Sequence, residues 1–133
     1  MMMNRKVYYL DWFDEYDTGI QWIDDEHKKI IRISNDILSI ITQGANPIDK
    51  VQHLFSLLEI HFMRMERFLH KVKSKDIDCF KTEHEAIKKE FLKCFEKYSF
   101  YKDISVIIDI LEKSVISHIR HDIKILKGLT GQK

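Results

Sequence analysis

Apolar residues recur along this chain with the three-then-four spacing of amphipathic α-helices, in four separate stretches. The spacing is clearest in the first stretch, where Ile23, Ile30 and Ile37 mark the apolar face. Lys28 and Arg32 lie on the opposite face, as expected of a surface exposed to water. The pattern predicts a non-helical arm over residues 1–18 and helices over about 19–43, 47–73, 77–99 and 103–127.

Short breaks separate the four stretches. Gly44 is predicted to cap the end of the first helix, and Asn46-Pro47 to open the second with a capping side chain followed by a proline at the first helical position. Asp103 is predicted to cap the start of the fourth helix, and Gly128 to stop it. Four amphipathic helices joined by short loops predict an all-α fold, an antiparallel up-down-up-down four-helix bundle.

Composition narrows the class of protein. The chain, residues 1–133, has the length of a single domain, and its 22 Lys and Arg against 21 Asp and Glu leave a formal net charge of +1. A chain this evenly charged lacks the basic excess that binds a phosphate backbone, so we expect no nucleic-acid partner. No apolar run has the length of a membrane span or of a signal-peptide core. We therefore expect a cytoplasmic protein with no membrane partner.

The two cysteines, Cys79 and Cys94, fall within one predicted helix. They lie about four helical turns apart, so they cannot form a disulfide with each other inside that helix. We interpret both as small thiols that face the core.

Each predicted helix carries one histidine on its apolar face. These inward histidines are His27, His61, His84 and His118, whereas the remaining three, His53, His70 and His121, are expected at the surface. A single buried imidazole usually finds a hydrogen-bond partner, but four would each need one in an interior made mostly of Ile, Leu and Phe. Metal sites inside helical bundles are built in this way from facing helices, so we predict that the four bind metal.

Several other chemistries are excluded. The ferritin-like di-iron pattern needs a glutamate three residues before a histidine on two helices, and those positions hold Asp24, Leu58, Lys81 and Val115. The sequence has no His-Glu-x-x-His motif, no glycine-rich phosphate loop and no nucleophile with an arranged base. We therefore expect a binding protein and not an enzyme.

Four motifs resemble those of the hemerythrin family, one in each predicted helix. They are the run Asp-Thr-Gly-Ile-Gln-Trp-Ile-Asp-Asp-Glu-His over 17–27, then His61-Phe62, Glu83-His84 and His118-Ile119. Their order and spacing cover nearly the whole chain, which is similar to a bacterial-type single-domain member. The resemblance implies a bundle that holds two iron ions, bridged by two carboxylates and an oxo or hydroxo group and completed by five histidines. It also implies a role in binding or sensing dioxygen or another small diatomic.

Carried over residue by residue, the resemblance gives His27 and His61 to one iron, and His84 and His118 to the other. The family's remaining positions, a bridging glutamate, a histidine and a bridging aspartate, hold Met65, Phe80 and Ile123 in this chain. Two adjacent cations repel each other, and without the bridging carboxylates only neutral imidazoles would surround them. The sequence therefore does not carry the family's usual di-iron ligand set.

Three hypotheses remain open. In the first, which we favour, the metal site is altered: some of the four histidines hold one ion, with Met65 as a soft thioether ligand, or an iron site uses carboxylates relocated to Glu66 or Asp122 and turned inward by a π-bulge. In the second, Met65, Phe80 and Ile123 fill the pocket, and a metal-free bundle acts as a structural or protein-interaction domain. In the third, the chain binds iron and oxygen, and its ligands are other residues than those matched above, because the match to the family is misaligned across the loop over 73–78. The identity and number of the metal and any protein partner stay open.

Overall fold

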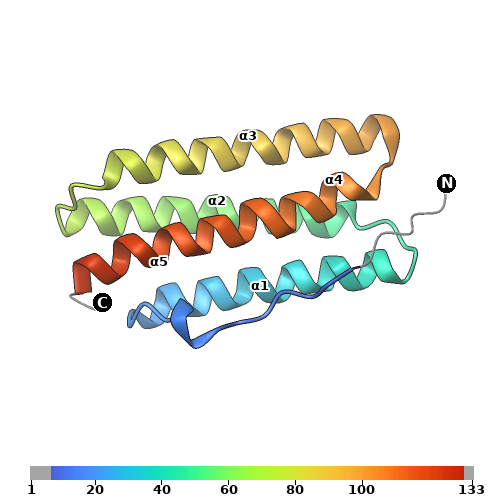
Figure 1. Ribbon diagram of the computed structural model, residues 1–133. Coiled ribbons are helices and arrows are strands. Elements are labelled where there is room, and N and C mark those ends of the chain that lie inside the picture. The colour runs from blue at the N-terminus through green and yellow to red at the C-terminus, as the bar shows by residue number, and fades with distance from the viewer. Residues whose placement is uncertain (1–6, 131–133) are drawn as a thin grey trace.

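The computed structural model describes residues 7–130, which form a bundle of long helices connected by short turns at alternate ends (Figure 1). The helices are α1 (Gln21–Thr42), α2 (Ile48–Lys71), α3 (Ile77–Tyr101), α4 (Ile104–Asp109) and α5 (Ile116–Thr130), with a π-helical segment (Ile110–Val115) that joins the last two into one continuous rod. Strands are absent from the described residues. The predicted all-α up-down-up-down bundle is confirmed. None of the helices in residues 7–130 combines the length and the apolar character that crossing a bilayer requires.

Most predicted helix signals operate as expected. Gly44 follows α1 with a φ of +77°, a conformation that glycine adopts without steric strain. At the start of α2, Pro47 takes the N-cap position and not the predicted first helical position, but the Oδ1 atom of Asn46 still accepts a hydrogen bond from the Ile48 N–H at 3.0 Å. At the start of α4, Oδ1 of Asp103 accepts one from the Ser105 N–H at 2.9 Å. These side chains satisfy backbone donors that the first helical turn leaves unpaired.

The last helix ends later than predicted. Its backbone continues through Gly128 to Thr130, so the expectation that Gly128 stops the helix is wrong. Glycine ends a helix where the chain turns into the left-handed region, and among the described glycines only Gly19 and Gly44 have a positive φ. The bounds of the other helices differ from the predicted ones by no more than two residues, apart from the division of the fourth into α4, a π-helical segment and α5.

The N-terminal arm lies along α1 (Figure 1). Asn35 of α1 holds it there, because its side-chain amide donates to the Leu10 carbonyl at 2.8 Å and accepts from the Leu10 N–H at 2.7 Å. The arm contains one 3₁₀ turn, Asp14–Tyr16, so the prediction of a wholly non-helical arm is wrong there. Tyr16 of this turn is buried and packs edge-on against Trp12, with ring centroids 5.4 Å apart. Residues 1–6 of the predicted arm lie outside the described residues.

Two apolar clusters form the core. The larger one includes Leu38, Leu58, Phe91 and Leu111 and draws on all the long helices. The smaller one lies at the end of the bundle where α1 and α3 begin, and consists of Ile23, Met65, Leu69, Phe80 and Leu126. Along α1, α2, α3 and the continuous fourth helix, the inward histidine lies between a residue of the larger cluster and a residue of the smaller one. The histidines therefore form a polar layer that divides the apolar core.

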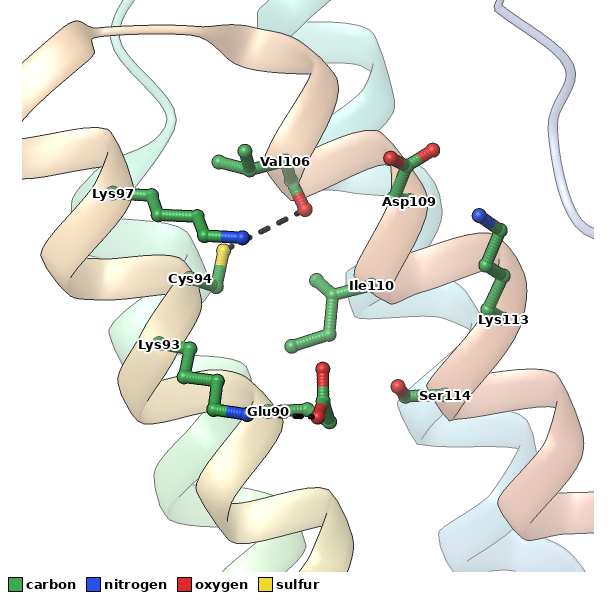
Figure 2. A pocket seen from close by; sticks show the side chains of 9 residues that line it. All are labelled: Glu90, Lys93, Cys94, Lys97, Val106, Asp109, Ile110, Lys113 and Ser114. Carbon is green, nitrogen blue, oxygen red and sulfur yellow. Dashed lines mark hydrogen bonds and ion pairs between the residues drawn. The ribbon is translucent and has the colours of Figure 1, made fainter.

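A surface cavity of about 290 Å³ opens between α3 and the π-helical segment (Figure 2). Its lining includes Cys94, whose thiol donates a weak hydrogen bond to the Val106 carbonyl at 3.7 Å, and none of the inward histidines. Cys94 is buried, as predicted for a thiol that faces the core, and burial raises the pKa of its thiol to about 11. Cys79 is exposed, so the prediction that it faces the core is wrong.

Candidate metal centre

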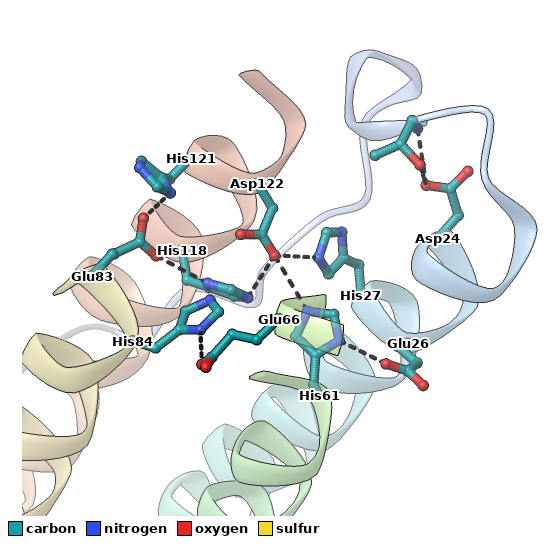
Figure 3. A network of polar contacts seen from close by, with 11 residues as sticks. Asp24, Glu26, His27, His61, Glu66, Glu83, His84, His118, His121 and Asp122 are labelled. Carbon is teal, nitrogen blue, oxygen red and sulfur yellow. Dashed lines mark hydrogen bonds and ion pairs between the residues drawn. The ribbon is translucent and has the colours of Figure 1, made fainter. Parts of the chain in front are cut away.

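Asp122 on α5 carries a fully buried carboxylate on which three histidines converge (Figure 3). Its Oδ2 atom lies 3.1 Å from Nε2 of His27, 3.3 Å from Nε2 of His61 and 2.9 Å from Nε2 of His118. The three rings come from α1, α2 and α5, and all are buried. One side-chain atom from each of the four residues lies within 4.8 Å of the others, which is the spacing of a candidate metal ligand set.

The helix phase explains why Asp122 faces inward. Asp122 follows His118 by one turn of α5, so both side chains lie on the same side of the helix. The fourth rod does contain a π-helical segment, but Ile110–Val115 precedes both residues and does not lie between them. A π turn contains an extra residue and rotates all that follows it, so this segment sets the phase of the two side chains together. Ile123, where the resemblance places a bridging aspartate, packs in the larger apolar cluster.

Glutamates hold three of the histidines from outside the centre, each acting from the preceding helix (Figure 3). The pairs of carboxylate oxygen and Nδ1 are Glu26 with His61 at 2.7 Å, Glu66 with His84 at 3.1 Å, and Glu83 with His118 at 3.0 Å. A carboxylate only accepts hydrogen bonds, so each Nδ1 donates and each Nε2 is directed toward the interior. His27 has no such support, because its Nδ1 is buried without a hydrogen-bond partner.

Burial and neighbouring charges shift the pKa values of the residues in the centre in opposite directions. Burial lowers the pKa of His27, and it lowers that of His84 to about 4. Burial also disfavours the charged form of His118, but the carboxylates of Asp122 and Glu83 outweigh it and raise the pKa of His118 to about 9. Although burial favours a neutral Asp122, the charge on His118 and the hydrogen bonds from His118 and His27 hold the pKa of Asp122 well below its usual value. His118 and Asp122 therefore form a buried imidazolium–carboxylate pair.

Apolar side chains close the other half of the site. Met65 and Phe80, at two of the positions where family ligands are missing, are fully buried and pack in the smaller apolar cluster. Phe80 lies edge-on to His84 with ring centroids 5.3 Å apart, and Phe62 stacks on His84 with centroids 4.0 Å apart. The Nε2 atom of His84 is buried and has no hydrogen-bond partner. This half therefore offers one imidazole among apolar groups.

A second group of candidate ligands overlaps the first and consists of Glu83, His84, His118 and Asp122. The two groups share His118 and Asp122, so two ions would compete for the same donors. Glu83 is also engaged already, because it accepts from His118 and forms an ion pair with His121. Two adjacent cations need several carboxylates to offset their repulsion. The donor set therefore fits one ion better than two.

The structure thus brings three of the four predicted histidines to one carboxylate and leaves His84 beside them. Glu66 is 29% exposed and faces the outer nitrogen of His84, not the centre. Met65 lies among apolar side chains. His121, expected at the surface, is only 26% exposed and contacts Glu83.

Sequence reasoning missed the roles of Glu26 and Glu83. Each directly precedes an inward histidine, in Glu26-His27 and Glu83-His84. A residue next to an inward position lies on the flank of its helix, where it faces the neighbouring helix. A glutamate directly before an inward histidine is therefore the signal that could have indicated them.

Glu26 is itself held in place. Its second oxygen forms an ion pair with Arg64, whose guanidinium lies over the Trp22 ring at 4.9 Å from the centroid. A cavity of about 270 Å³ outside His61 is lined by both Glu26 and Arg64. Glu26 therefore contacts both Arg64 at the surface and the buried His61 ring, whose orientation it fixes.

We expect Glu26→Ala to weaken metal binding about 10- to 100-fold, the usual effect of losing a carboxylate that orients a histidine ligand. Competition against a chromophoric chelator measures this. Glu59→Ala, which removes an exposed glutamate of the same helix as His61, is the control and should bind as tightly as the wild type. Equal affinities for both variants would contradict a positioning role for Glu26.

Comparisons with known proteins identify the family of the chain. A family model, the hemerythrin HHE cation-binding domain, matches residues 18–129. A bacteriohemerythrin of Clostridium acetobutylicum is 29% identical over 94 residues, which cover 66% of this chain and 70% of that protein. No solved structure gives a significant match. The matched residues include α1 to α4, all but the last residue of α5 and all of the residues that converge on Asp122, and the chain belongs to the hemerythrin family.

Proposed function

We propose that this chain binds a single iron ion through His27, His61, His118 and Asp122. The observation that carries the proposal is the convergence of three Nε2 atoms on one buried carboxylate oxygen. Imidazoles combined with a carboxylate suit divalent transition metals, ferrous iron among them. The match to a cation-binding family supports a metal, and iron is the metal that the family resemblance implies.

The residues present fit such an ion. Oδ1 of Asp122 is buried and has no hydrogen-bond partner, so the carboxylate has an oxygen available for a cation. Glu26 and Glu83 fix the rings of His61 and His118 from outside, an arrangement that protein metal sites use to orient ligands. Binding would replace the proton that His118 carries, because a metal ligand must be deprotonated.

The chain's own contribution is to hold the ligands and to exclude water. The centre lies between two apolar clusters, and its ligands are buried. An iron ion held by these residues would supply the binding of dioxygen or another small diatomic. We therefore propose binding or sensing, and not catalysis, as the role of the chain.

Metal content tests the proposal. Protein purified without a metal-affinity tag is loaded anaerobically with ferrous iron, freed of excess metal and analysed by plasma emission spectrometry. We expect one iron per chain, and no oxo-bridge absorption band after exposure to air. Two irons per chain with such a band would contradict the single-ion site.

The alternative is a metal-free bundle that serves as a structural or interaction domain. One observation favours it: Met65, Phe80 and Ile123 are all buried in apolar clusters, as expected if packing has replaced the ligands. The buried pair of His118 and Asp122 would then be part of a polar core. Absence of any metal uptake in the same assay would support this function.

A further inference from the structure

His84 is the inward histidine that Asp122 Oδ2 does not bond. Its Nδ1 faces Glu66 at 3.1 Å, whereas its Nε2 is buried with no hydrogen-bond partner. Phe62, stacked at 4.0 Å, and Phe80, edge-on at 5.3 Å, fix the plane of the ring. His84 therefore presents one unpaired nitrogen in a fixed direction, away from Glu66.

The hydrogen bond between Glu66 and Nδ1 of His84 determines whether Nε2 is a donor or an acceptor. Because the Glu66 carboxylate can only accept, it takes the hydrogen on Nδ1 of His84. In a neutral imidazole the other nitrogen then carries a lone pair. Nε2 of His84 is thus a hydrogen-bond acceptor, and a buried acceptor without a donor is unfavourable.

The position of His84 separates it from the proposed ligands. One of its atoms lies within 4.8 Å of atoms of His118 and Asp122, but His84 does not join the group that contains His27 and His61. A second ion around His84 would lack its other ligands, because Met65 and Phe80 occupy those positions. The lone pair therefore lies at the side of the centre, and the candidate ligands around it are either shared with the centre, as His118 and Asp122 are, or already engaged, as Glu83 is.

We infer that His84 is not a metal ligand but accepts a hydrogen bond from the small ligand at the open position of the single ion. This inference rests on the proposed function, since it requires an ion at the neighbouring residues. A lone pair attracts a ligand that carries an O–H group, of which water is the simplest, and disfavours an aprotic anion. His84 thereby makes the site selective for protic ligands.

Azide is a suitable probe, because it is an aprotic anion that must displace water from the ion. The test compares ferric-loaded wild type with His84→Leu, which removes the acceptor, and Glu66→Gln, whose amide can donate to Nδ1 and so lets Nε2 carry the proton. Glu85→Gln, an exposed position on α3, is the control. Iron per chain is measured first, and the azide dissociation constant is then obtained from the absorbance change.

We expect every variant to retain one iron per chain. The azide dissociation constant should fall roughly 2- to 10-fold in His84→Leu, the effect of one lost hydrogen bond, and change in the same direction in Glu66→Gln, while the control stays unchanged. If His84→Leu does not fold, His84→Phe, a ring without an acceptor, takes its place, because the Glu66→Gln amide can also accept from Nδ1 and does not by itself fix the tautomer of His84.

The outcomes separate this inference from the proposed function. If the wild type takes up no iron, the proposed function fails and the inference with it. If the wild type binds one iron and folded His84→Leu loses it, His84 is a ligand, so the inference is overturned while metal binding stands. Full iron content with unchanged azide constants also overturns the inference.

Discussion

Asp122→Asn abolishes iron binding while the bundle stays folded. Asp122 supplies the carboxylate on which the three histidines converge, and an amide of the same shape leaves only neutral donors around a divalent cation. Because asparagine keeps the size of the side chain, we expect the packing of α5 to persist. After anaerobic loading, emission spectrometry should find no bound iron, and circular dichroism should report the helical content of the wild type.

The matched control is Asp36→Asn, the same chemical change at an exposed position of α1. It should retain the iron content of the wild type, because Asp36 lies on the solvent face. If Asp122→Asn bound a full complement of iron, the proposed site would be contradicted, because both groups of candidate ligands include Asp122.

Removal of the metal lowers the melting temperature by roughly 10–20 °C. An ion that binds only the folded chain stabilises it by about 4 kcal/mol at a free concentration 1,000 times its dissociation constant. For a domain of this size, each 1 kcal/mol corresponds to a shift of about 3–5 °C. Thermal unfolding of the iron-loaded protein, followed by circular dichroism with and without a strong chelator, measures the difference.

The chelator itself needs a control, and Asp122→Asn provides it. This variant has lost the proposed ligand, so its melting temperature should not change when the chelator is added. A wild type that is equally indifferent would contradict the proposed metal site and would favour the metal-free bundle. A loss of stability in both proteins would show an effect of the chelator unrelated to the centre.

The local sequence pattern was sufficient to predict the helices and the face of each helix that is buried. The period of 3.6 residues places His27, His61, His84 and His118 on apolar faces, and all four are buried in the structure. Local capping chemistry likewise located the starts of α2 and α4. Gly128 was misjudged because a glycine only permits a helix end and does not impose one.

The contacts between helices could not be predicted from the local sequence pattern. Glu26 and His61 are 35 residues apart, and their hydrogen bond depends on the rotation of α1 against α2. The one-turn spacing within α5 already places Asp122 beside His118, but its contacts with His27 and His61 depend on the phase of the fourth rod, which the π-helical segment Ile110–Val115 changes. No periodicity within a single helix contains this information.

The sequence by itself determined the bundle, the inward histidine of each helix and the missing ligands at Met65, Phe80 and Ile123. Each of these follows from residue type and spacing within one helix or from the motifs of the hemerythrin family. Only the tertiary structure decided which three histidines meet Asp122, that glutamates support the rings from the preceding helix, and that His84 stands apart with an unpaired nitrogen. The physical reason is that hydrogen bonds and ligand sets depend on distances of a few ångström between helices, which are fixed by packing and not by the pattern along any one of them.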